Sequence, residues 1–187
     1  MIDPLFAADW YWAASDGRLY SSARQSLVAQ DDEAFAAWQV GGRRPTAWPR
    51  DEAGEETVSA LQDVLTRYGR WADLTAYAAH RRWLAETGGI VVAGTAIATD
   101  RESQALIMGA RLYAQATPDT SFQFKAAAGF VTLDGADIEA VALAVAAHVQ
   151  ACFAVEAGVR ADIEAGTITT LSQVDGAAWP AGEPNGE

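Results

Sequence analysis

The first 70 residues have the apolar pattern of a small sheet followed by helices. Two aromatic-rich runs, at residues 10–12 and 19–20, flank Asp16-Gly17, and an Asp-Gly pair between apolar runs is a strong hairpin signal. A third short strand is expected over residues 26–29. The acidic run at residues 31–33 suits the positive end of a helix dipole. Residues 1–70 therefore predict an aromatic module of hairpin and helix.

The stretch from residue 43 to residue 54 interrupts this module. Pro45, Pro49 and Gly54 break regular structure, which predicts a connector. Glu55 and the residues after it have helical spacing, so a second helix is expected to begin there.

The second part, residues 71–176, alternates helical spacing with short β-branched runs. The pattern predicts a helix to about Thr87, a hairpin over 90–99, a second helix that Pro118 ends, and a hairpin over 122–133. A long last helix follows, to about residue 165. Residues 177–187, rich in Pro and Gly, are expected to be a flexible tail. The fold class is therefore α+β, with modules at 1–70 and 71–176.

The long helix carries an apolar seam, because Ile138, Val145, Cys152 and Val159 are seven residues apart. Two interpretations stay open: the helix packs within its own domain, or it also pairs between subunits. The second interpretation makes the following residues candidate interface positions: Ile138, Val145, Val149, Val159 and Trp179.

The net charge of the chain excludes some classes of binding partner. The chain has 187 residues and a net charge of −12, and such a surface repels nucleic acids and anionic membranes. The stretch 138–155 looks too polar for a bilayer, and the first residues lack the pattern of a signal peptide. We therefore expect no nucleic-acid partner, no membrane partner and synthesis in the cytoplasm.

Motifs for catalysis are scarce. His148 and Cys152 share a helix face and could form a nucleophilic pair, but their place on the apolar seam favours a structural role. His80 could act as a general base, although basic residues near the end of a helix commonly complement its dipole. Asp100 is better explained as a helix cap. We expect no enzymatic activity, no catalytic or cofactor-binding residue, no cofactor and no metal.

Seven short stretches between residues 73 and 170 resemble a tail-associated domain of unknown function from tailed bacteriophages and prophages. The stretches are 82–90, 99–104, 107–110, 124–125, 129–133, 148–153 and 163–170. The N-terminal segment, with Trp10, Trp38 and Trp48, more loosely resembles modules of tail fibre and fibre-assembly proteins. The resemblance implies a component of the virion tail, without implying a reaction.

Three functions follow as hypotheses. The first is a structural or adaptor protein of a phage tail, at the tail tip, baseplate or fibre attachment, whose partners are other tail or fibre proteins. The second is a fibre-assembly chaperone that is absent from the finished virion. The third is a glycan-binding receptor module. The apolar seam of the long helix makes a homo-oligomer a further hypothesis, and the resemblance favours three-fold order.

Overall fold

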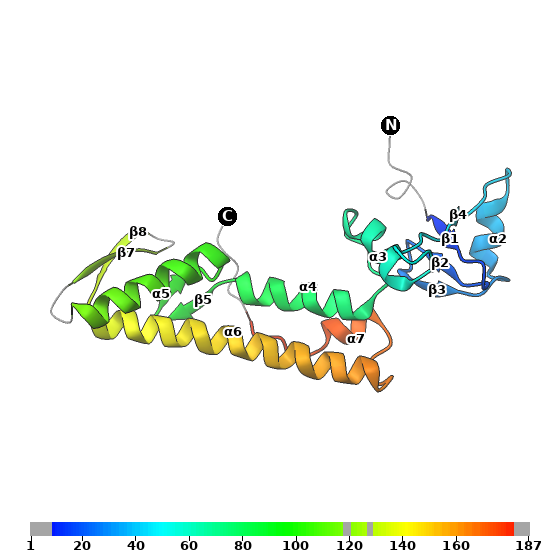
Figure 1. The fold of residues 1–187 in the computed structure, drawn as a ribbon. Helices are drawn as coiled ribbons and strands as arrows, with labels where there is room; N and C mark the ends of the chain where they lie inside the picture. The colour runs from blue at the N-terminus through cyan, green and yellow to red at the C-terminus, as the bar shows by residue number, and fades with distance from the viewer. Residues whose placement is uncertain (1–8, 118–120, 127–128, 182–187) are drawn as a thin grey trace. The chain divides into compact units, whose positions relative to one another are not determined.

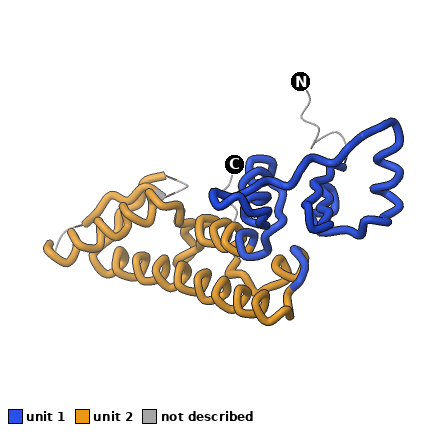
Figure 2. Tube along the Cα trace, turned by 45° about the vertical axis from the view of Figure 1, so that its right-hand side comes forward, with its two compact units in different colours: residues 1–77, 169–171 blue, residues 78–168, 172–187 orange. Residues whose placement is uncertain are grey.

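The computed structural model describes residues 9–117, 121–126 and 129–181. The chain forms two compact units (Figure 2): unit 1 comprises residues 1–77 and 169–171, and unit 2 comprises residues 78–168 and 172–187. The chain passes from one unit to the other within a helix, whereas the sequence placed the boundary at residues 70–71. That division of the chain stays a prediction.

Unit 1 contains a four-stranded sheet with the order β3-β2-β1-β4 (Figure 1). Its strands are β1 (Tyr11–Ala13), β2 (Leu19–Ser21), β3 (Ser26–Val28) and β4 (Thr46–Ala47). Strands β1 and β2 form the predicted antiparallel hairpin, in which Trp12 lies opposite Tyr20. Gly17 has a φ of 92°, which the tight turn requires. Strand β4 pairs in parallel with β1, so the expectation of a connector without regular structure was wrong at residues 46–47.

Two helices follow from local capping. Helix α2 (Glu33–Gln39) begins after Asp32, whose carboxylate accepts a hydrogen bond from the Phe35 amide. Helix α3 (Val58–Thr66) begins after Thr57, whose hydroxyl accepts from the Ala60 amide. The helical spacing predicts this start at Glu55, which is three residues too early. The hydroxyl cap is the physical reason, because it satisfies an N–H group that the first turn leaves unpaired.

Alternate residues of β1 and β2 belong to two different aromatic clusters. The first cluster consists of Trp12, Tyr20, Trp48, Leu61 and Leu65. The second consists of Tyr11, Leu19, Phe35 and Trp38. Because successive side chains of a strand point to opposite faces, three-residue strands can anchor both clusters. Most of the tryptophans in this unit are therefore core residues.

Unit 2 places helices and hairpins along one long helix (Figure 1). Its helices are α4 (Leu74–Thr87), α5 (Arg101–Ala116), α6 (Gly135–Glu164) and α7 (Leu171–Asp175), of which α4 and α7 begin in unit 1. Its strands are β5 (Ile90–Val92), β6 (Thr95–Ile97), β7 (Phe122–Ala126) and β8 (Gly129–Leu133), in two antiparallel hairpins. The predicted α+β class is confirmed. Helix α7 was not expected from the sequence.

The core of unit 2 lies where α6 meets α5 and the first hairpin. Its buried residues are Ile97, Ile107, Val141, Ala142 and Val145. Asp134 and Asp137 form a capping box that starts α6. Gly166, with a φ of 73°, follows its end. The long helix is thus bounded by local signals and held by its apolar inner face.

By its length and composition alone, helix α6 could cross a membrane. Of its most apolar 18-residue window, 33 % is buried inside the molecule. This finding overturns the reason given above, that the stretch is too polar for a bilayer. The core helix of a soluble protein meets the same criterion, so the finding by itself is weak evidence for a membrane span.

Candidate interaction surface

The seam residues predicted as interface positions lie inside unit 2. Ile138, Val145 and Val159 are buried within the chain, and Val149 is half-buried against the same core. Trp179 is also half-buried, and its Nε1 donates a hydrogen bond of 2.8 Å to the Val174 carbonyl. The structure thus uses the seam in the core of the domain, which was the first of the two interpretations. An additional role in subunit pairing stays a prediction.

A network of charged residues lies beside the seam, centred on the fully buried Glu86. Arg82, one helical turn away, forms an ion pair with this carboxylate. Arg101 approaches it to 3.2 Å, and the Gln104 amide donates to it over 3.2 Å. A carboxylate removed from water needs such partners. The sequence pattern did not predict that these side chains meet.

The network extends from α4 to α6. The Nε of Arg82 donates to Glu156 over 3.0 Å, and the guanidinium lies 4.8 Å from the centre of the Phe153 ring. The buried hydroxyl of Thr99 donates to the Glu86 carbonyl over 2.6 Å. The network therefore joins α4, the loop before α5, and α6. These contacts give it a structural role.

The His148–Cys152 pair is not arranged for nucleophilic catalysis. His148 Nε2 lies 2.9 Å from the Ala85 carbonyl oxygen, which only accepts, so this nitrogen carries the proton. The same nitrogen lies 3.8 Å from the Cys152 sulfur, and a protonated nitrogen cannot remove the thiol proton. Burial, and next the charge of Glu86, raise the pKa of the Cys152 thiol.

The structure also shows the positions of the other residues considered for catalysis, Asp100 and His80. Asp100 caps α5, as expected, by accepting from the amides of Glu102 and Ser103. Burial, and next the charge of Arg81, lower the pKa of His80. Within residues 9–117, 121–126 and 129–181, no three His, Cys, Asp or Glu side chains gather as metal ligands.

The opposite face of α6 was missed by the sequence analysis. Seven residues on this face, all exposed, carry no charge, and we call them the outer strip: Ala140, Leu143, Ala147, Gln150, Ala154, Gly158 and Ala161. Alanine recurs every seventh residue, at 140, 147, 154 and 161. The alanine repeat could have indicated this face from the sequence alone. The larger apolar residues of the seam gave the stronger pattern, and they lie on the buried face.

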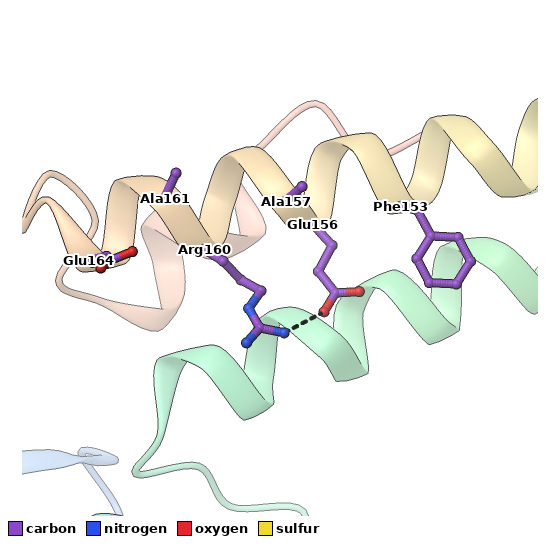
Figure 3. Close-up of a pocket in the computed structure, with 6 residues that line it drawn as sticks. All are labelled: Phe153, Glu156, Ala157, Arg160, Ala161 and Glu164. Carbon is purple, nitrogen blue, oxygen red and sulfur yellow. Dashed lines mark ion pairs between the residues drawn. The ribbon is translucent and has the colours of Figure 1, made fainter.

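A groove of about 510 Å³ runs along the C-terminal half of α6, beside the outer strip. Its lining consists of Phe153, Glu156, Ala157, Arg160, Ala161 and Glu164 (Figure 3). Figure 3 shows Arg160 and Glu156 directed toward α4, whereas Ala157 and Ala161 point the other way. The groove thus has one charged side and one side of methyl groups.

A second hollow, which we call the α5–hairpin pocket, lies between α5 and the β7–β8 hairpin. It has a volume of about 310 Å³. Leu106 from α5 and Phe130 from β8 line it, although their exposed fractions are 65 % and 73 %. Lys125, Gln123 and Ser103 supply polar groups. The pocket is therefore an apolar hollow that carries hydrogen-bonding groups.

Comparisons with known proteins identify one family. Neither the search of curated proteins nor the search of solved structures finds a match. A family described as a domain of unknown function, DUF4376, matches residues 70–178. That range contains α4 through α7, and with them the charged network, the outer strip and both hollows. Because the match covers more than half of the sequence, the chain belongs to the DUF4376 family.

Proposed function

We propose that the chain is a structural or adaptor component of a bacteriophage tail, at the tail tip, baseplate or fibre attachment, and that it acts through protein–protein contacts. The observation that carries the proposal is the amount of large apolar surface on unit 2. Leu106 and Phe130 stay largely exposed beside a pocket and are not among the buried core residues of the unit.

The exposed apolar residues are spread over several elements of unit 2. They are Trp83, Leu84, Val91, Leu106, Met108, Leu112, Tyr113, Phe130, Leu143 and Phe153. Single exposed apolar residues are ordinary, but groups of them rimmed by polar residues mark interaction sites. Aromatic side chains such as Phe130 and Tyr113 are common anchors of protein interfaces.

The assignment to a phage tail is supported by the resemblance of the sequence stretches described above, all of which lie within the family match. The charged network supports a binding role over catalysis, since its carboxylates are engaged by Arg82, Arg101 and Gln104. A protein that works by docking needs exposed apolar surface, which unit 2 provides.

Two measurements test this proposal. The genes that neighbour the coding sequence should encode tail proteins, and mass spectrometry of purified particles should detect the chain at a fixed ratio to a tail protein. Presence on free fibres but absence from particles would favour the assembly chaperone. Absence from both would refute the proposal.

A double variant and a control variant test whether the α5–hairpin pocket is the docking surface. Leu106→Ser combined with Phe130→Ser should lower incorporation into particles at least tenfold. Leu27→Ser, at an exposed leucine of unit 1, is the matched control and should leave incorporation unchanged.

A further inference from the structure

We propose that an extended segment of a partner protein binds along the free edge of β7 as an added strand, with a large apolar side chain in the α5–hairpin pocket and a carboxylate on Lys125. The proposal rests on the proposed function, because it names the kind of segment that docking on unit 2 involves. Three observations carry it: the free edge, the place of the pocket beside that edge, and the charge of the residues that line the pocket.

Strand β7 has a partner on one side and a free edge on the other. Within the described part of the chain, its sheet consists of β7 and β8 alone. In an antiparallel pair, every second residue of a strand turns its backbone N–H and C=O groups away from the partner strand. Among the described residues, no backbone group outside the hairpin bonds to β7. Such an edge is a template for a further strand.

The α5–hairpin pocket lies at this edge. Three consecutive residues of β7 line it: Gln123, Phe124 and Lys125. Successive side chains of a strand point to opposite faces, so a hollow that all three residues line must border an edge of the hairpin. The edge is that of β7, because β8 contributes only Phe130. Since Phe124 packs against the core of unit 2, Gln123 and Lys125 lie on the outer face of the hairpin.

Helix α5 supplies the apolar wall of the pocket. Ser103, Leu106 and Ala110 line it and share one face of the helix, because three and four residues separate them. The same face continues along β7, where Tyr113 packs edge-on against Phe122 with 5.7 Å between the ring centres. The pocket volume of about 310 Å³ is near the lower limit for ligand pockets. The hollow therefore has room for one large apolar side chain of a strand that lies on the edge.

The charge of the lining residues indicates the charge of the partner. Lys125 is the only lysine of the chain and the only charged residue that lines the pocket. It is exposed and forms no ion pair with a described residue. Because the chain carries a net charge of −12, most of its surface repels a carboxylate, whereas this position attracts one. The ion pair contributes orientation and specificity more than affinity.

Strand geometry fixes the spacing of the two partner groups. The pocket lies on the α5 side of the edge, whereas Lys125 lies on the outer face, where it is paired with Phe130. The side chains of an added strand also alternate between the two faces. The apolar residue and the acidic residue of the partner should therefore be adjacent in its sequence. A helix in the same place would carry them three or four residues apart on one face.

A library of short linear peptides is the probe for the full-length protein. Selection should enrich peptides in which Asp or Glu is adjacent to a large apolar residue. A synthetic peptide from this set should lose at least tenfold in affinity when its backbone N–H groups are methylated at alternate residues in one phase, and keep its affinity in the other phase. A library without binders, or a peptide weakened equally in both phases, would overturn the proposal.

Paired variants test the two contacts. Lys125→Glu should weaken peptide binding at least tenfold, and exchanging the acidic residue of the peptide for lysine should restore it. Arg44→Glu, the same change of charge at an exposed arginine of unit 1, is the control. Leu106→Ser should also weaken binding at least tenfold, whereas Leu112→Ser should not, because Leu112 is equally exposed on α5 but lies outside the pocket. Binding that neither Lys125→Glu nor Leu106→Ser weakens would overturn the proposal.

Two other roles of the edge give different results. A dimer of the free protein that Leu106→Ser dissociates would show that a second copy covers the edge. Aggregation of Lys125→Ala, together with no peptide binding by the wild type, would show that the lysine only protects the edge. Either result would overturn the proposal.

Failure of this inference is distinguishable from failure of the proposed function. A chain that is present in particles but binds no peptide would refute the added strand alone. A chain that binds the peptides but is absent from particles and from free fibres would refute the assignment to a phage tail alone.

Discussion

Arg82 and Glu156, which are 74 residues apart in the sequence, form an ion pair of 3.0 Å that joins α4 to α6. The same guanidinium is paired with Glu86, whose side chain is completely buried. Arg82 thus holds two carboxylates that have little access to water. Removing one partner of a buried ion pair leaves an uncompensated charge, which is strongly destabilising.

We therefore expect Arg82→Met to lower the free energy of unfolding by about 3–5 kcal/mol. Arg160→Met is the control, because the side chain of Arg160 is more than half exposed, and it should cost about 0–1 kcal/mol. Urea unfolding followed by circular dichroism measures both. Equal effects of the two substitutions would show that the network does not hold the helices together.

The two faces of α6 should respond oppositely to charge. Val145 is buried in the core, so Val145→Asp buries an unpaired carboxylate and should cost several kcal/mol, on the order of 3–5. Leu143→Asp lies on the exposed face and should leave the free energy of unfolding of the monomer within about 1 kcal/mol. Urea unfolding followed by circular dichroism tests this. An unfolded Leu143→Asp variant would contradict the assignment of the faces.

The Cys152 thiol should be unreactive in the native protein. It is fully buried, and burial, with the charge of Glu86, raises its pKa, so little thiolate forms at neutral pH. A disulfide reagent should react at least a hundredfold more slowly with the native chain than with the chain in urea. Reaction at the rate of free cysteine would contradict burial.

Gly109→Ala should raise the stability of the protein by about 1 kcal/mol. Gly109 lies inside α5, and a Cβ added to it meets nothing within 4 Å. Alanine restricts the unfolded chain and fits the helix. Thermal unfolding measures the change, and Gly17→Ala is the contrasting variant, which should destabilise because that turn needs a φ of 92°. A fall in stability for Gly109→Ala would mean that the position is packed.

Acid should weaken unit 1 through Asp9. Burial raises the pKa of this carboxyl, but hydrogen bonds from the Ala23 amide and from Ser21, Tyr11 and Ser22 outweigh it, so the pKa lies below its ordinary value of 3.8. A depressed native pKa gives stability that is present above pH 3.8 and is lost as the pH falls from there through the native value.

Asp9→Asn should therefore reduce the loss of stability between about pH 4 and pH 2. Urea unfolding as a function of pH, followed by tryptophan fluorescence, measures it. An unchanged pH dependence would show that Asp9 does not carry this effect.

The sequence alone was sufficient to predict the structural features that depend on neighbouring residues. The turn at Asp16-Gly17 and the cap at Asp100 follow from side chains and backbone preferences within a few residues. The α+β class follows from the alternation of the 3.6-residue and two-residue periods. These features depend on contacts within a few residues, which a linear pattern records.

Only the tertiary structure decided that the face of α6 opposite the seam stays exposed. The seven-residue spacing identified the seam of Ile138 and Val145 as a packing face, but the helix is apolar nearly all round, so the pattern could not show whether the face of Ala147 and Ala154 would also be covered. The difference arises because α5 and the first hairpin supply apolar partners on one side. The partners of Glu86 could not be predicted for the same reason: Arg82, Arg101 and Gln104 meet that carboxylate only when separate helices pack, and sequence spacing does not encode which helices will do so.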